Sequence, residues 1–140
     1  MQIERARKGL RFAGYASVFD HLDRGGDIVR PGAFARTLAR QGKVPLLWQH
    51  QPGHQIGNIE HLAEDARGLQ VIASLNDDAF GRQLARELEQ GRLSGLSFGY
   101  RVTVSDHGTA AREIRDLELL EVSLVRRPMQ PRACVHKIAS

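Results

Sequence analysis

The chain has 140 residues, of which 41% are hydrophobic and 26% charged, a composition ordinary for one globular domain large enough to bury a core. We therefore expect a single domain over residues 1–140. No apolar stretch approaches the roughly 20 residues needed to cross a membrane, and the charged residues 1–5 are not followed by the apolar core of a signal peptide. The single cysteine, Cys134, suits a reducing cytoplasm, and we interpret it as a buried structural thiol.

The formal charge of +4 comes from 20 Lys and Arg residues against 16 Asp and Glu residues. The basic residues are scattered, and only two tyrosines and one tryptophan are present for base stacking. The sequence therefore does not support nucleic-acid binding. The charge implies no more than a general affinity for acidic surfaces.

The first half of the chain predicts strands around one short helix. Alternation with β-branched and aromatic residues predicts a strand over 10–19, followed by a polar, glycine-rich loop over 20–26. A helix is expected over 33–40, ending near a glycine. The apolar run 44–50 predicts a strand in which Pro45 favours an edge position or the strand start.

A hairpin and the clearest helix follow. The runs 56–59 and 69–75, separated by the turn 65–68, predict the hairpin. The helix face is marked by apolar side chains spaced by four residues, with Asn76, Asp77 or Asp78 as the cap and Gly91 as the end: Phe80, Leu84 and Leu88.

The last third predicts long strands over 96–105 and 114–125 and a short one over 133–138. The fold class is therefore mostly β with a few helices. We expect a closed β-barrel flanked by helices, because closure leaves no open sheet edges.

Ser97 is the first candidate for chemistry. Gly95 and Gly99 share its strand face, so the hydroxyl is expected in a cleared space that a substrate backbone could approach. The alternative is a small residue filling a crowded interior. Ser94 and Ser123 compete as nucleophiles, but Ser94 lies in a turn and Ser123 has bulky neighbours.

His50 and Glu121 are candidate partners of Ser97. His50 ends an apolar run, where an imidazole can accept a serine proton; the alternative is a surface-loop histidine. Strict alternation places Glu121 on one face with Leu117 and Leu119, where a carboxylate needs a partner such as His50. The alternative is a rim carboxylate paired with arginine.

Metal sites find little support. The spacing of His50 and His54 matches H-x3-H, but the Pro-Gly between them excludes the helix such a pair needs. Asp20, Asp23 and Asp27 lie in a glycine-rich loop but lack the spacing of an EF-hand. We expect neither a metal nor another cofactor.

Several blocks occur together in a specific order between Gly14 and Val135: residues 14–19, 27–34, 46–50 with 56–57, 95–100, 120–125 and Pro128. With these blocks the chain resembles the prohead (capsid maturation) proteases of tailed bacteriophages and gene transfer agents. The resemblance implies a serine endopeptidase with a barrel similar to the herpesvirus assembly proteases.

In such enzymes the histidine that ends the block matching residues 46–50 is the general base, which falls on His50. The serine of the glycine-flanked block, residues 95–100, is the nucleophile, which falls on Ser97. The third member falls on Glu121, where the herpesvirus enzymes use a second histidine. Their oxyanion-supporting arginine pair corresponds to Arg126 and Arg127.

The resemblance also implies partners and a location. The expected substrate is the scaffold-like segment of the major capsid protein, and the chain itself as a second target, cut inside the assembling prohead in the bacterial host cytoplasm. Members often carry a C-terminal extension, so an end soon after Cys134 suggests a short or processed form. A homodimer could form through the 80–88 helix face, although that face is expected to cover its own core.

Two other functions stay open. A non-enzymatic capsid assembly or scaffold-binding protein could keep the barrel without activity, and would not react with serine-directed phosphonates. A small esterase or amidase would turn over small esters without cleaving peptides.

Overall fold

The computed structural model describes residues 8–40, 42–108 and 110–139, so residues 1–5, considered above for a targeting signal, lie outside it. In chain order its elements are β1 (Lys8–Val18), β2 (Asp27–Val29), α2 (Ala35–Ala39), β3 (Leu46–Trp48), β4 (Gln55–Glu64), β5 (Gly68–Asn76), α3 (Ala79–Glu89), β6 (Gly95–His107), β7 (Arg112–Val125) and β8 (Val135–Ala139). The mostly β fold class is confirmed. No described helix is long and apolar enough to cross a membrane.

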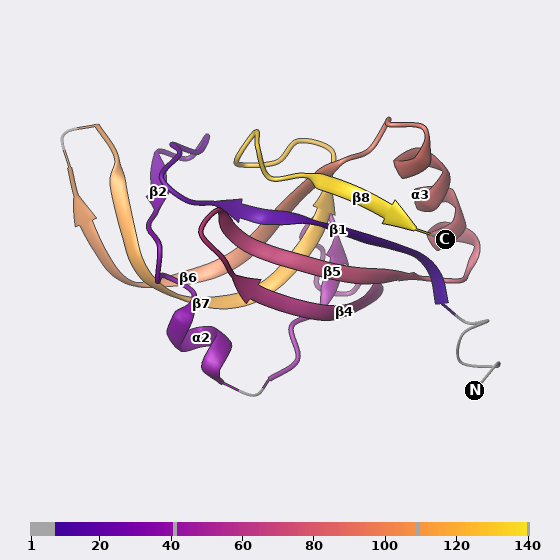
Figure 1. Ribbon diagram of the computed structural model, residues 1–140, viewed down its shortest axis with the longest axis horizontal. Coiled ribbons are helices and arrows are strands. Elements are labelled where there is room, and N and C mark those ends of the chain that lie inside the picture. The colour runs from indigo at the N-terminus through magenta and orange to yellow at the C-terminus, as the bar shows by residue number, and fades with distance from the viewer. Residues whose placement is uncertain (1–7, 41, 109, 140) are drawn as a thin grey trace.

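The described strands form one mixed sheet with the order β2-β7-β3-β4-β5-β1-β8, and β6 pairs with β7. Both β2 and β3 run parallel to β7, β2 against its start and β3 against its end. The other ladders are antiparallel. β7 is thus the strand on which the N-terminal half and β6 meet (Figure 1).

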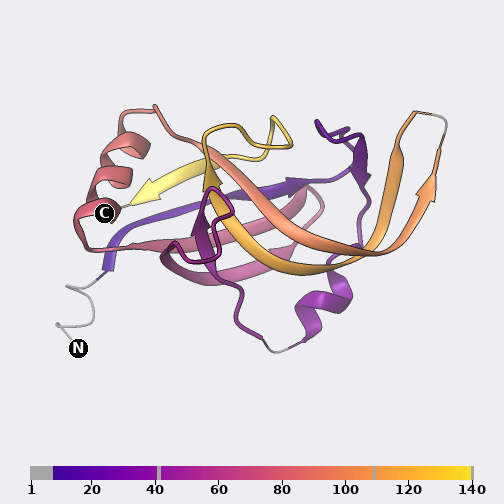
Figure 2. The ribbon, with the colours of Figure 1, turned by 180° about the vertical axis from the view of Figure 1, so that it is seen from behind.

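The closed barrel is not confirmed. Among the described strands, β8 has a ladder only with β1, and β6 only with β7. An isolated bridge between Gly95 and Cys134 joins the two sides. β8 begins only at Val135, and the far halves of β6 and β7, with β2 along the start of β7, extend away from the rest of the sheet, at the left of Figure 1 and the right of Figure 2.

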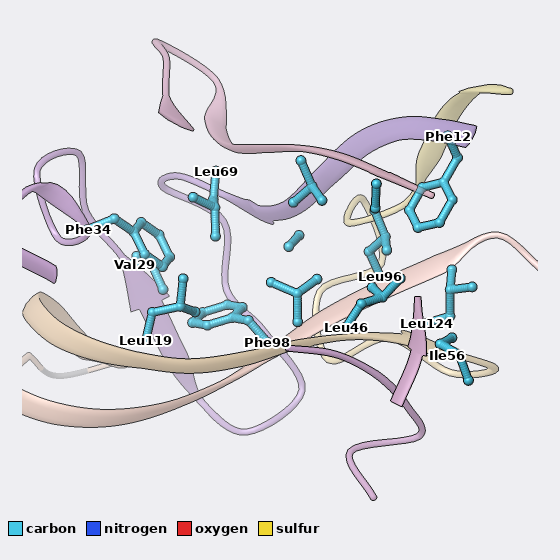
Figure 3. Packing of buried hydrophobic residues seen from close by; sticks show 14 of the residues in the cluster. Phe12, Val29, Phe34, Leu46, Ile56, Leu69, Leu96, Phe98, Leu119 and Leu124 are labelled. Atoms are coloured by element: carbon cyan, nitrogen blue, oxygen red, sulfur yellow. The ribbon is translucent and has the colours of Figure 1, made fainter. Parts of the chain in front are cut away.

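The core lies inside the curl of this sheet. Figure 3 shows side chains of β1 and β5 pointing toward those of β6 and β7 across the enclosed space. Phe34, next to α2, packs edge-on against Phe98 of β6 with ring centroids 5.3 Å apart. Burial of this apolar set supplies the main driving force for the curled sheet: Phe12, Leu69, Val71, Leu96, Phe98, Leu119, Val122 and Leu124.

The helix α3 matches its prediction. Asp78 is the N-cap and its carboxylate accepts the Gly81 N–H at 2.7 Å, as capping side chains do. Leu84 and Leu88 are buried in the core, so this face covers its own sheet. Gly91, with φ +74°, follows the helix end, a conformation that glycine adopts without a steric cost.

Other predictions needed adjustment. The helix over 33–40 is shorter, Ala35–Ala39, because turn hydrogen bonds from Ala33 and Ala35 precede it. The three-residue β2 has no pattern long enough to be predicted. Cys134 is half-buried rather than buried, because it leads into the edge strand β8.

Candidate active site

A strained turn after β3 carries His50. The strand ends at Trp48, and Gln49 and His50 both adopt left-handed backbone conformations, with φ of 52° and 60°. Each such non-glycine residue costs about 1–2 kcal/mol. The Gln51 N–H closes the turn on the Trp48 carbonyl at 3.0 Å, and the Gln49 N–H donates to the Leu124 carbonyl of β7 at 3.0 Å. His50 is therefore held at a turn against β7, not on the predicted strand.

The His50 imidazole contacts Glu121 directly. Its Nδ1 lies 2.5 Å from Glu121 Oε2, and the two side chains are 42% and 13% exposed. An ionised carboxylate can only accept, so Nδ1 carries a proton, and in the neutral imidazole Nε2 then has the lone pair. The geometry leaves Nε2 available as a base.

Glu121 does not share a strand face with Leu117 and Leu119, as strict alternation predicted. The pairing of β6 with β7 shifts register between Gly99 and Tyr100, so that Leu120 is an extra residue, 44% exposed. A one-residue bulge reverses the side-chain alternation beyond it. Glu121 consequently lies opposite the face that packs into the core, which spares the carboxylate burial among apolar side chains.

Gly99 makes room for this carboxylate. It pairs with Glu121 across the ladder, and a Cβ built on Gly99 would overlap the Glu121 carboxylate, lying 2.9 Å from its Cδ. Gly95 instead leaves room for the Val125 carbonyl and Pro128. The two glycines do clear space on the Ser97 face, but the carboxylate and the 125–128 segment occupy it.

Ser97 lies between these glycines on β6, directly opposite Ser123 of β7, and is 6% exposed. Ser97 and His50 line the same cavity of about 100 Å³. The structure therefore joins His50 to Glu121 by contact and places Ser97 and His50 in the lining of one cavity. The other lining residues come from four separate segments: Ala16, Asp23, Gly25, Asp27, Phe98, Tyr100, Met129 and Gln130.

Two carboxylates in this cavity have opposite electrostatics. Asp27 accepts from the Arg112 guanidinium at 2.8 and 2.9 Å and from the Tyr100 hydroxyl at 3.0 Å; Arg112 above all holds the pKa of Asp27 below its usual range. Burial raises the pKa of Asp23, although backbone N–H groups of Gly25 and Asp27 donate to it. Sequence reasoning missed this wall, because no local motif links these residues to Ser97.

The two arginines proposed for the oxyanion, Arg126 and Arg127, have different contacts. The Arg126 guanidinium binds Glu87 of α3 at 2.7 Å and lies over the Trp48 ring at 5.4 Å. The backbone N–H of Arg126 donates to Gln49 Oε1 at 2.7 Å. Arg127 is exposed and lines a second pocket, of about 260 Å³, with His50. Arg126 therefore supports the His50 turn, while Arg127, the other member of the pair, forms no ion pair with a described residue.

The remaining candidates have other partners. His54 stacks on Phe80, with ring centroids 4.9 Å apart, rather than joining His50. Asp20 binds Arg30 at 2.7 Å. Within residues 8–40, 42–108 and 110–139, no three His, Cys, Asp or Glu side chains gather as a metal site would need. Ser123 is fully buried and donates to Glu121, which does not suit a nucleophile.

Two bacteriophage proteins are similar to this chain in sequence. The HK97 prohead protease is 33% identical over 135 residues, covering 92% of this chain and 60% of that protein. The Escherichia phage T5 prohead protease is 28% identical over 124 residues, covering 85% and 58%. The chain thus spans about three fifths of the length of these curated relatives.

Solved structures show the same fold. A KSHV protease in complex with a hexapeptide phosphonate inhibitor has a TM-score of 0.65 at 16% identity, covering 94% of this chain and 65% of that one. The bacteriophage T4 capsid assembly protease has a TM-score of 0.65 at 16% identity, covering 86% and 84%. The family model described as caudovirus prohead serine protease matches residues 1–140. The chain belongs to the caudovirus prohead serine protease family.

Proposed function

We propose that this chain is a serine endopeptidase domain that cleaves capsid proteins during prohead maturation. The observation that carries the proposal is the 2.5 Å contact between His50 Nδ1 and Glu121 Oε2, with Ser97 in the lining of the same cavity as His50. A base held by a carboxylate beside a serine hydroxyl is the arrangement that activates a nucleophile. Family membership supports the same reaction class.

In the proposed reaction, Glu121 keeps the Nδ1 proton of His50 in place, and His50 Nε2 takes the Ser97 proton as the hydroxyl attacks the scissile carbonyl. The protonated imidazole then gives this proton to the leaving amine. Water, deprotonated by the same nitrogen, hydrolyses the acyl-enzyme and restores Ser97.

The oxyanion needs donors, each worth about 3 kcal/mol in such sites. Arg126 and Arg127 both line a pocket with His50, and Arg127 supports this role because it forms no ion pair with a described residue. Arg126 supports it less, since both its backbone N–H and its guanidinium already have partners. We assign Arg127 to the oxyanion side and Arg126 to the turn.

The proposed substrate is the scaffold-like segment of the major capsid protein, cut inside the assembling prohead in the host cytoplasm, with self-cleavage as a second event. We propose residues 1–140 as one domain without a cofactor. A homodimer stays a prediction, and the α3 face offered for it already packs on the core.

The test is co-expression with the major capsid protein of the same genome, comparing wild type and Ser97→Ala by intact mass. Shortening of the capsid protein with wild type alone, and none with Ser97→Ala, is expected. Assembled shells with an unshortened capsid protein in both cases would overturn the proposal in favour of a non-enzymatic assembly factor. Turnover of small esters without capsid cleavage would favour an esterase.

A further inference from the structure

We infer that Ser123 is a positioning residue that couples the backbone of His50 to the carboxylate of Glu121. The inference rests on the proposed function, because it concerns the same His50 and Glu121. Ser123 Oγ accepts the backbone N–H of His50 at 3.1 Å and donates to Glu121 Oε1 at 2.8 Å. One hydroxyl of β7 thus binds both the backbone of His50 and the carboxylate of Glu121.

The hydrogen-bond inventory fixes these directions. A hydroxyl has one proton and two lone pairs, and the His50 N–H can only donate, so the Ser123 proton points to Glu121. Glu121 then has both oxygens engaged, Oε1 by Ser123 and Oε2 by His50 Nδ1. With both oxygens held, the carboxylate cannot rotate without breaking a charge-assisted hydrogen bond.

His50 needs such an anchor. Its φ of 60° lies in the left-handed region, and its side chain is 42% exposed, so packing alone does not fix the ring. The neighbouring contact from Gln49 to Leu124 holds the preceding residue only. The bond to Ser123 restrains the backbone N–H of His50 itself.

Burial makes the hydroxyl hard to replace. Ser123 has 0% exposure and faces Ser97 across the ladder. An alanine there would leave the His50 N–H and Glu121 Oε1 each without this partner, where water has little access. The expected result is a displaced imidazole in a folded protein, because the core face of β7 is unchanged.

The experiment compares wild type, Ser123→Ala and Ser74→Ala by inactivation with a peptidyl phosphonate and by NMR. Ser74 is also buried, at 2% exposure, on β5. We expect Ser123→Ala to lower kinact about 10- to 100-fold, the loss typical of a misplaced catalytic group, with KI within about 2-fold. The low-field Nδ1–H resonance of His50 should weaken, and its backbone amide should exchange faster. Ser74→Ala should change none of these.

Each outcome decides a different claim. An unreactive wild type overturns the proposed function and this inference together. A reactive wild type with unchanged kinact, Nδ1–H resonance and amide exchange in Ser123→Ala overturns the role of Ser123 alone. If Ser123→Ala does not fold, Ser123→Cys keeps the branching of the side chain with a larger sulfur atom and only a weak donor, and it should show the same losses; wild-type behaviour of this variant would overturn the inference.

Discussion

The two faces of β7 near its end differ in nearly every property. One face, with Leu119, Val122 and Leu124, is buried in the apolar core. The other carries Glu121 and Ser123, whose polar atoms contact His50. Stability and proposed chemistry therefore share one strand but not one face.

The extra residue Leu120 creates this division. It is the point at which the ladder shifts register, after which the inward positions move from the odd to the even residues. Without it, Glu121 would lie with Leu119 toward the core, where an ionised carboxylate is costly. A bulge can thus place a charged group in a site without disturbing the core beside it.

The largest effect is expected on the polar face, where replacing Glu121 by glutamine should slow the reaction of Ser97. Gln keeps the shape but can place an N–H against Nδ1, so the tautomer of His50 changes. We expect phosphonate inactivation to slow by about 10⁴-fold, as when a triad carboxylate becomes an amide, with stability nearly unchanged. Glu118→Gln on the same strand is the matched control, since Glu118 pairs with Arg40 and Arg101 instead. Equal rates for the two variants would contradict the role of Glu121.

On the core face, shortening Leu124 to alanine should lower the free energy of unfolding. Leu124 has 0% exposure, so we expect a loss of about 2–5 kcal/mol in unfolding free energy by urea denaturation. The folded fraction should still react at Ser97. Leu120→Ala, at a 44% exposed position of the same strand, should cost less than about 0.5 kcal/mol. A comparable loss at Leu120 would contradict the assignment of the faces.

Gly99→Ala should affect the reaction on the polar face without affecting the stability supplied by the core face. The new methyl overlaps the Glu121 carboxylate, so that side chain must move. We expect a 10- to 100-fold slower inactivation with little change in Tm. Gly42→Ala meets no atom within 4 Å and serves as the control. An active Gly99→Ala enzyme would show that the Glu121 position tolerates displacement.

The smallest effect concerns the start of β7, where Arg112 holds Asp27. Because the pKa of Asp27 is lowered in the fold, this contact stabilises the protein above the unfolded pKa of about 3.9 and is lost as pH falls through the folded value. Wild type should therefore exceed Asp27→Asn by about 1–2 kcal/mol near pH 6, and the difference should shrink in acid. Urea titrations at several pH values measure it. Asp106→Asn, at an exposed ion pair, is the control; a pH-independent difference for Asp27→Asn would contradict the contact.

Much of the fold could be predicted from local patterns. The hairpin of β4 and β5, the long strands β6 and β7, and α3 with its Asp78 cap carry strong periodicity or capping signals. The three-residue β2 carries none, because its stability comes from parallel pairing with β7. Barrel closure also depends on where β8 begins, which periodicity does not fix.

The site was partly predictable. The residue types and the resemblance singled out His50, Ser97 and Glu121, and the structure adds the contact of His50 with Glu121 and a cavity lined by both His50 and Ser97. The strand face of Glu121 was wrong, because a bulge at Leu120 has no sequence signature in a leucine pair. Ser123 was considered only as a nucleophile, since its bond to His50 depends on the parallel pairing of β3 with β7.

The most direct measurement is to treat the purified chain with a fluorophosphonate and map the adduct by peptide mass spectrometry. We expect one adduct on wild type, located on Ser97, none on Ser97→Ala, and strong slowing in His50→Ala. An adduct on another serine, or no adduct on a folded wild-type protein, would contradict the assignment of Ser97 as the nucleophile.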